Sequence, residues 1–365
     1  MTLDRRAFLL GTLALSATLP ACVGQRRRGT LLSAFEDARG DQYIGGLMLE
    51  QERMFGARVP TRAHGCAIDP RNLERAIFFA RRPGTQAFEL DVRSQQVRQI
   101  FETPPGRHLS GHGAFSASGE LLFTPEHDYE RVRGVICVRD TRDFSLVREI
   151  DTHGIDPHEL AWLPGHRRLL VANGGIMTHP RTYRRKLNID TMDPSLCAID
   201  AVSGDCVEQW RLPDHLLSIR HLSVAEDGTA AVGLQYEGNR ERAPCVVALY
   251  RPGAGLKLLN TPDGVHEHFA GYIASVGISD AANLIAASCP YGRGVACWSK
   301  RSGAFRGFVA ARDAFGLSQL ADGSMVVSQR DGGAFEIDES RLRSQFLNIV
   351  STGPIRWDDH WVAAG

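Results

Sequence analysis

The sequence predicts an all-β protein, a single β-propeller with seven blades. Three features carry this prediction: a unit that recurs along the chain, a strongly apolar strand in each unit, and an Asp-rich hairpin behind that strand. Repeats of roughly 40 to 60 residues with about four strands each are typical of propeller blades, which bury their faces only against neighbouring blades. The 365 residues, of which 43% are hydrophobic, are sufficient for one such ring.

Six of the expected blades follow directly from the repeat. Each unit opens with a short strand, and the openings begin at His64, His112, His158, His221, Ser275 and Gly316. The apolar strands that follow them span residues 76–80, 121–124, 169–172, 230–234, 284–288 and 325–328. Continuous apolar runs between turns are typical of strands that are buried on both faces.

The two ends of the chain supply the remaining strands. We expect residues 43–49, 53–59 and 355–363 to form a composite seventh blade that joins the N-terminus to the C-terminus. A ring of six blades with an additional hairpin is the alternative. The expected organisation is therefore a signal segment at 1–22, a linker at 23–41 and one propeller domain at 42–365.

The first 22 residues read as an export signal rather than as part of the fold. Arg5 and Arg6 precede a short apolar run, Leu9 to Leu19, as in twin-arginine signals. This run is shorter than the ~20 residues that a membrane-spanning helix needs. The segment that ends at Cys22 also resembles a lipoprotein processing site, with ordinary cleavage nearby as the alternative. We therefore expect a periplasmic protein that contacts the membrane only through a lipid anchor, if at all.

Charge and cysteine content restrict the partners and the chemistry. The formal net charge is +0, so no overall field favours nucleic acid or an anionic membrane. Beyond Cys22, two cysteine pairs flank turn-like segments, Cys197 with Cys206 and Cys289 with Cys297. These pairs are cross-strand disulfides or buried free thiols, and none of the spacings is a zinc pattern.

Four histidines recur at the opening of successive units: His64, His112, His158 and His221. Because the innermost strand of each blade lines the central channel, equivalent positions form a ring around the axis. Neutral imidazoles suit iron, copper, nickel and zinc, so we expect a metal site in this ring, with iron or copper as the candidate ions. The alternative is a structural histidine that joins strands within each blade.

A second set of residues indicates an anionic ligand. The unusually long segment after residue 172 contains Asn173, His179, Arg185 and Lys186, and loops of this length are often functional. Arg220 precedes one ring histidine, and Tyr272 lies close to the opening of the fifth unit. We expect these six residues to contribute to ligand binding, although a surface loop held by its own ion pairs explains the segment equally well.

Several stretches resemble one family of exported bacterial proteins, the domain of unknown function 1513. These stretches include Val171–Gly175, Thr178–Pro180, Lys186–Asn188, Arg220–Leu222 and His268–Tyr272. The resemblance covers nearly the whole chain beyond the signal and implies a twin-arginine-exported propeller. It also implies a setting in periplasmic iron handling, beside imelysin-like lipoproteins and di-haem, peroxidase-like proteins.

Three functions remain open from the sequence. The first is a periplasmic protein that binds a metal ion or metal complex in the histidine-lined channel. The second is a metal-dependent oxidoreductase that uses the same site, and the third is a scaffold that docks proteins without a cofactor. The chain contains no GxSxG elbow, P-loop, HExxH helix or CxxCH haem site, which removes support from the common hydrolase and nucleotide-dependent mechanisms.

Overall fold

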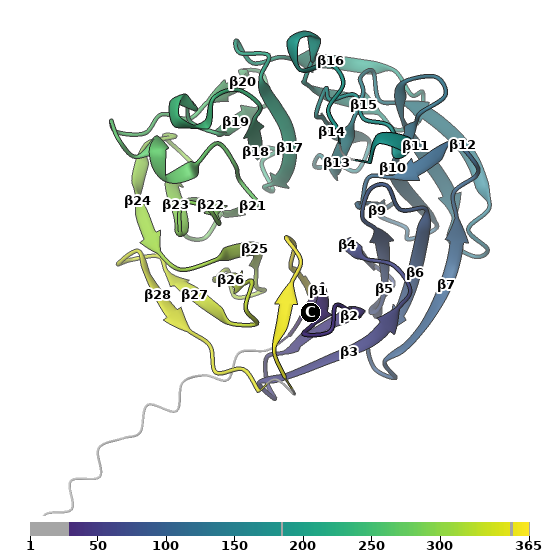
Figure 1. The fold of residues 1–365 in the computed structure, drawn as a ribbon, viewed down its shortest axis with the longest axis horizontal. Helices are drawn as coiled ribbons and strands as arrows, with labels where there is room; N and C mark the ends of the chain where they lie inside the picture. Colours follow the sequence, from purple (N-terminus) through teal and green to yellow (C-terminus); the bar gives the residue numbers. More distant parts are fainter. Residues whose placement is uncertain (1–28, 184, 351–352, 365) are drawn as a thin grey trace, which may run out of the picture.

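The structure is a computed structural model that describes residues 29–183, 185–350 and 353–364. The signal segment and Cys22 lie outside these residues. Seven antiparallel sheets are arranged around a central axis, which confirms the seven-bladed β-propeller (Figure 1). Within the described part of the chain, no helix has the length and apolar character to cross a membrane.

Each of the first six blades is formed by consecutive strands, which follow one another from the axis outward. Blade 1 contains β4 (Ala63–Asp69), β5 (Asn72–Ala80), β6 (Gln86–Asp91) and β7 (Gln96–Glu102). Blade 2 contains β8 (Arg107–Leu109) with β9 (Ala114–Phe115), then β10 (Leu121–Asp128), β11 (Arg133–Asp140) and β12 (Leu146–Asp151). Blade 3 contains β13 (Pro157–Trp162), β14 (Arg168–Asn173), β15 (Ser195–Asp200) and β16 (Cys206–Trp210).

Blade 4 contains β17 (Leu217–Val224), β18 (Ala230–Tyr236), β19 (Val247–Arg251) and β20 (Gly255–Leu258). Blade 5 contains β21 (Ser275–Ser279), β22 (Leu284–Cys289), β23 (Gly294–Ser299) and β24 (Phe305–Ala310). Blade 6 contains β25 (Ala314–Gln319), β26 (Met325–Gln329), β27 (Ala334–Asp338) and β28 (Arg343–Phe346). Four single-turn 3₁₀ helices lie in loops between strands: η1 (Pro180–Thr182), η2 (Ile189–Thr191), η3 (Arg240–Arg242) and η4 (His266–Phe269).

Blade 7 is the composite blade that the sequence predicts. Its innermost position is shared by β29 (Ile355–Trp357) and β30 (Val362–Ala364), both paired with β1 (Thr30–Asp37). The outer strands are β2 (Gln42–Met48) and β3 (Arg53–Val59). Figure 1 shows the C-terminal segment, in yellow, beside β1, in purple, where the ring closes.

One boundary expected from the sequence is wrong. The expected linker includes residues 30–37, but they form β1, the strand between the C-terminal strands and β2. The repeat does not mark this strand because the inner strand that normally precedes it comes from the opposite end of the chain. The expected single strand at 355–363 is likewise divided into β29 and β30.

The apolar core lies between blades rather than within them. One cluster joins Leu32 and Ile44 of blade 7 to Phe78 and Phe88 of blade 1. Other clusters join blades 2 and 3, blades 5 and 6, and blades 6 and 7 in the same way. Because every blade buries its faces against two neighbours, the last contact, made by blade 7, stabilises the whole ring.

Trp357 tests this closure. Its side chain is 1% exposed, and its ring packs edge-on against Phe35 and Trp361 at centroid separations of 5.4 Å each. We expect Trp357→Ala to lower the free energy of unfolding by about 3–5 kcal/mol, because the change leaves a cavity where the ring closes. Chemical denaturation followed by tryptophan fluorescence and circular dichroism measures this loss. Arg356→Ala is the matched control, because its exposed side chain on the same strand predicts a change within about 0.5 kcal/mol.

A histidine-lined channel as the candidate site

Irregular pairing in the innermost strands turns some of their side chains toward the axis of the propeller. Regular pairing is interrupted between Ala63 and Cys66 in β4, between Pro157 and Glu159 in β13, and beside His221 in β17. Such β-bulges bend a strand locally and turn a side chain out of its regular alternation. The bulges fall at or next to the recurring histidines. At these positions the side chains leave the regular alternation of the sheet and point into the channel.

In blades 2 and 7 the interruption is wide enough to divide the innermost strand. Residues 110–113 separate β8 from β9, and residues 358–361 separate β29 from β30. These segments place His112 and His360 at the axis. His360 is the residue that the repeat did not identify as part of the ring, because no repeat unit opens at this position. The only signal in the sequence is its place between two acidic residues and Trp361.

Glycines allow these segments to approach one another. A Cβ atom on Gly111 would lie 2.8 Å from Cδ2 of His64, and one on Gly65 would lie 3.0 Å from Nδ1 of His112. Gly316 of blade 6 has a similar role, because a Cβ there would lie 2.9 Å from the carbonyl carbon of His360. Larger residues at these positions would push the histidines away from the axis.

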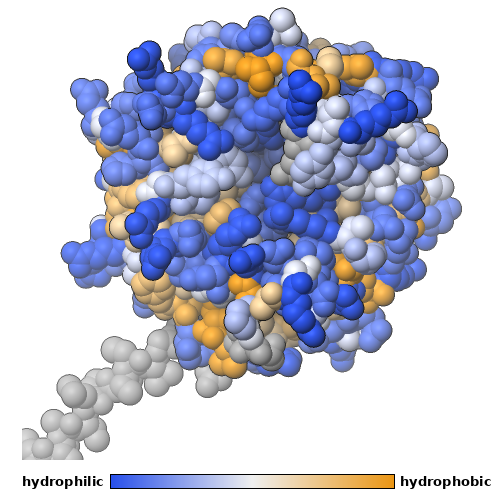
Figure 2. Space-filling model, in the orientation of Figure 1, coloured by the Kyte–Doolittle hydropathy of each residue, from blue (hydrophilic) through white to orange (hydrophobic). Residues whose placement is uncertain are grey.

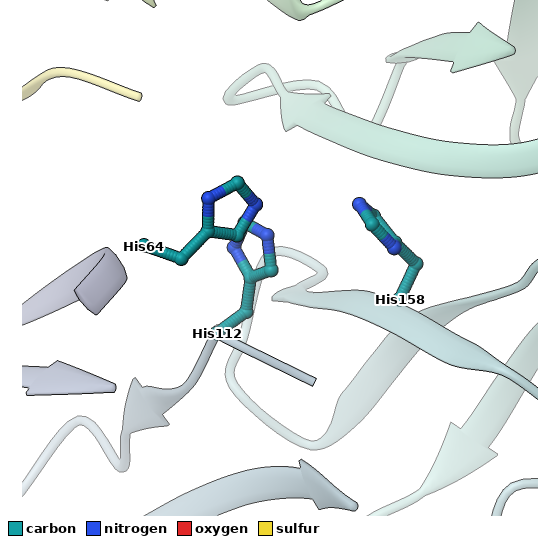
Figure 3. Close-up of side chains that lie close together, drawn as sticks. All are labelled: His64, His112 and His158. Carbon is teal, nitrogen blue, oxygen red and sulfur yellow. The ribbon is translucent and has the colours of Figure 1, made fainter. Parts of the chain in front are cut away.

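Five imidazoles therefore meet in the channel. We refer to them as the histidine cluster: His64, His112, His158, His221 and His360. Neighbouring ring centroids are 4.5–6.2 Å apart, with the shortest separation between His64 and His360. Figure 3 shows three of them, which reach a common space from three blades. The structure thus brings together all four histidines singled out by the repeat and adds His360.

Carboxylates orient several of these rings. Nδ1 of His64 lies 2.5 Å from Oδ1 of Asp358, and Nδ1 of His221 lies 3.3 Å from Oε2 of Glu159. The other oxygen of Glu159 is 3.8 Å from Nδ1 of His112, which is beyond hydrogen-bonding distance. A carboxylate behind a histidine is the usual support of a metal ligand, because it fixes the tautomer with Nδ1 protonated and leaves Nε2 free.

The opposite nitrogens face the channel. Nε2 of His112 and Nε2 of His360 are buried and have no hydrogen-bond partner. One ligand atom from each of His112, His221 and His360 can be chosen so that all three lie within 4.8 Å of one another. Small side-chain rotations would bring these nitrogens onto one ion, for which metal–nitrogen bonds are about 2.0–2.1 Å.

Burial keeps the cluster neutral. It lowers the pKa of His112 and of His221 to about 3 and that of His360 to about 4. Burial also holds the pKa of His64 well below its ordinary value. A neutral imidazole is the form that binds a metal ion, so these rings need not release a proton first.

His158 differs from the other members. Its Nδ1 lies 3.3 Å from Nη1 of Arg220. A guanidinium can only donate, so Nδ1 of His158 accepts this hydrogen bond and the proton of the neutral ring resides on Nε2. His64, His112 and His158 also come close enough to form a group of potential ligands. The tautomer nevertheless makes His158 less suited to bind an ion than His112, His221 or His360.

Two chambers of the channel border the histidine cluster. One chamber, of about 120 Å³, is bordered by His64, His158 and His221, and we call it the cationic chamber. Its remaining lining residues are Arg81, Arg82, Ser110, Thr178, Lys186, Arg220, Gln235, Tyr272 and Asp359. The second chamber, of about 270 Å³, is bordered by His112, His221 and His360 together with Glu159. Figure 2 shows that hydrophilic residues, in blue, occupy the centre of the ring.

The six residues expected to bind a ligand divide into two groups. Lys186, Arg220 and Tyr272 line the cationic chamber. Asn173, His179 and Arg185 are not among the described residues that line it. Arg81 and Arg82 line the chamber but were not singled out from the sequence, because they follow a central strand and belong to no motif.

The three residues outside the chamber have other surroundings. Asn173 is fully buried and its amide donates to the carbonyl oxygen of Thr152, which is a structural contact. His179 accepts a hydrogen bond from the backbone of Arg181 at the start of η1. Arg185 is exposed. The polar composition of the loop therefore pointed to a segment that reaches the cationic chamber, without distinguishing which side chains turn inward.

The cysteines do not form the disulfides considered from the sequence. All seven that the structure describes are free thiols: Cys66, Cys137, Cys197, Cys206, Cys245, Cys289 and Cys297. Within the described strands, Cys206 is opposite Ile199 and Cys297 is opposite Ala286, so neither expected pair is directly cross-strand. The free-thiol alternative is the one that the structure contains.

Residues 57–364 match a family described as "Protein of unknown function (DUF1513)". The chain belongs to the DUF1513 family. Among curated proteins, no sequence matches this DUF1513 protein.

Solved structures show that the fold is shared more widely. Hydrazine synthase of Kuenenia stuttgartiensis superposes with a TM-score of 0.60 at 16% identity, covering 88% of this chain and 93% of that chain. A chain in the crystal structure of the mitotic checkpoint complex gives a TM-score of 0.56 at 14% identity, covering 78% of each chain. At these identities the likeness concerns the propeller fold of the DUF1513 protein and not its chemistry.

A buried histidine outside the histidine cluster, His127, makes stability depend on pH. Burial, together with the charge of Arg82, lowers the pKa of His127 to about 3. Between its unfolded pKa near 6.5 and its folded pKa, His127 binds a proton only in the unfolded chain, so falling pH destabilises the folded state. We expect His127→Gln to reduce the slope of unfolding free energy against pH by about 1.4 kcal/mol per pH unit between pH 5.5 and 4. Denaturation series at several pH values give this slope, and an unchanged slope would contradict the prediction.

Proposed function

We propose that this DUF1513 protein binds one transition-metal ion on the propeller axis, with His112, His221 and His360 as its ligands. The observation that carries the proposal is the pair of buried, unpartnered Nε2 atoms of His112 and His360. A buried polar atom without a partner costs about 1–3 kcal/mol, and a bound ion would remove that cost at both positions. Glu159 supports the same assignment, because its carboxylate contacts Nδ1 of His221 at 3.3 Å and thereby leaves Nε2 of that ring available to an ion.

The proposed ligand set restricts the ion. Neutral imidazoles suit iron, copper, nickel and zinc, whereas magnesium and calcium prefer oxygen ligands. Three protein ligands leave at least one coordination position for water or another ligand, on the side of the second chamber. Iron(II) and copper(II) are the first ions to test, because the family resemblance implies a setting in iron handling.

We further propose that the protein acts in the periplasm. Arg5 and Arg6 with the apolar run that follows them support this location. Export by the twin-arginine pathway moves folded proteins, which is compatible with a metal site that exists only in the closed ring. Fractionation of cells that express the full chain or an Arg5→Lys/Arg6→Lys variant tests both the location and the route. Absence of the full chain from the periplasmic fraction would contradict the location, and an unchanged periplasmic fraction in the variant would contradict twin-arginine export.

Metal binding is tested on the purified protein after treatment with a chelator. Iron(II), copper(II), cobalt(II) and zinc(II) are added separately, and the bound ion is measured by equilibrium dialysis with elemental analysis. We expect one ion per chain for at least one of these metals. His360→Gln should weaken binding by more than 100-fold, because losing a ligand costs more than the ~10–100-fold loss that follows removal of a residue hydrogen-bonded to a ligand.

Two further variants decide what a loss of binding means. Glu159→Gln keeps the size of the side chain and should weaken binding by about 10–100-fold, since it removes the charge that orients the ligands. His127→Gln is the matched control, because His127 and His112 are each 6% exposed but His127 belongs to none of the potential ligand groups. Equal losses in His127→Gln and His360→Gln, or no bound ion in the unmodified protein, would overturn the proposal.

A further inference from the structure

The cationic chamber contains more hydrogen-bond donors than its own residues satisfy. Its lining includes three arginines and one lysine, namely Arg81, Arg82, Arg220 and Lys186, whereas Asp359 is the one acidic residue among the described residues that border it. These cations come from separate places: Arg81 and Arg82 follow β5, Arg220 lies on β17, and Lys186 belongs to the loop between β14 and β15. The fold therefore collects them at one end of the channel.

Carboxylates behind the chamber hold the cations in place. Asp156 pairs with Arg82, and its side chain is 0% exposed. Glu237 pairs with Lys186 and is 4% exposed at its side chain. Arg81 contacts Asp358 and Asp359 at 3.4 and 3.1 Å. Because Asp156, Glu237 and Asp358 do not line the chamber, these ion pairs fix the cations in position while the lining itself remains rich in hydrogen-bond donors.

Arg220 is the least satisfied of these groups. It is 6% exposed, and its Nε has no hydrogen-bond partner. Its Nη2 lies 3.8 Å from Asp156 and 3.9 Å from Glu237, which is beyond hydrogen-bonding distance. Nη1 of Arg220 donates to His158, but a buried guanidinium that leaves its other donors unused is costly unless a ligand accepts from them.

From this arrangement we propose that the cationic chamber binds a small oxyanion, such as a carboxylate or an inorganic oxyanion, between Arg82, Arg220 and Lys186. Guanidinium groups recognise such anions through paired N–H donors, and Tyr272 adds a hydroxyl. The volume of about 120 Å³ is somewhat smaller than the ~150 Å³ known to hold benzene, so a ligand of up to about five non-hydrogen atoms fits.

This site adjoins the proposed metal site but does not depend on it. His221 borders both chambers, so an anion in the cationic chamber would lie beside one of the proposed metal ligands. The anion donors belong to residues other than the metal ligands. Binding of the anion is therefore expected in metal-free protein and in His360→Gln.

The proposal is tested by isothermal titration calorimetry of the metal-free protein. Acetate and phosphate are titrated separately, in a chloride buffer of constant ionic strength. Lys186→Met should weaken binding at least about tenfold, because it removes a charged donor. Arg185→Met is the matched control, since it removes a neighbouring cation of the same loop whose exposed side chain does not line the chamber. Its affinity should stay within about twofold of the unmodified protein.

Two additional variants separate ligand recognition from folding. Arg82→Lys keeps the charge that pairs with Asp156 but loses the paired donors, so it should weaken binding about tenfold with unchanged circular dichroism. Lys186→Met/Glu237→Gln removes both members of an ion pair, which leaves no unpaired acid behind, and it should bind as weakly as Lys186→Met.

No heat of binding to either anion up to about 10 mM, or equal losses in Lys186→Met and Arg185→Met, would overturn the proposal. Lys186→Met should still bind the metal ion, which shows that its weaker anion binding does not result from damage to the metal site.

Discussion

The pairing of the C-terminal strands with β1 closes the ring and also builds the site. β29 and β30 occupy the innermost position of blade 7, and the residues between them enter the channel. Asp358 contacts His64 of blade 1, and His360 packs against His64, His112 and His221 of three other blades. The channel site is therefore complete only when the two ends of the chain have joined, and ring closure and site assembly are one structural event.

Burial sets the chemistry of this channel. The histidines are kept neutral because an imidazolium would lose its hydration there, while Asp358 keeps its charge because arginines are close. Burial alone would raise the pKa of Asp358, but the combined effects of Arg81, His64 and Arg62 outweigh it and hold this pKa well below its usual value. The result is a layer of neutral nitrogens beside a layer of ion pairs. The first suits a metal ion and the second suits an anion, and His221 borders both.

The sequence predicted the fold well because each blade repeats the same burial pattern. The histidines at the openings of four units were found for the same reason, since equivalent positions in a closed ring converge on its axis. β1 and His360 were missed because blade 7 is assembled from both ends and has no repeat opening. Arg82 was missed because its role depends on Asp156, which is far from it in the sequence but is its ion-pair partner in the structure. Asn173 shows the opposite error, because an unusual residue in the loop proved to be a buried structural amide.

A crystal structure of the protein loaded with cobalt(II) or zinc(II), with diffraction recorded on both sides of the metal absorption edge, tests the axial metal site most directly. We expect one anomalous peak on the propeller axis, within about 2.0–2.3 Å of Nε2 of His112, His221 and His360, with Glu159 still in contact with His221. A peak elsewhere, such as at an exposed histidine or at Cys206, with the three rings unchanged, would contradict a metal site on the axis.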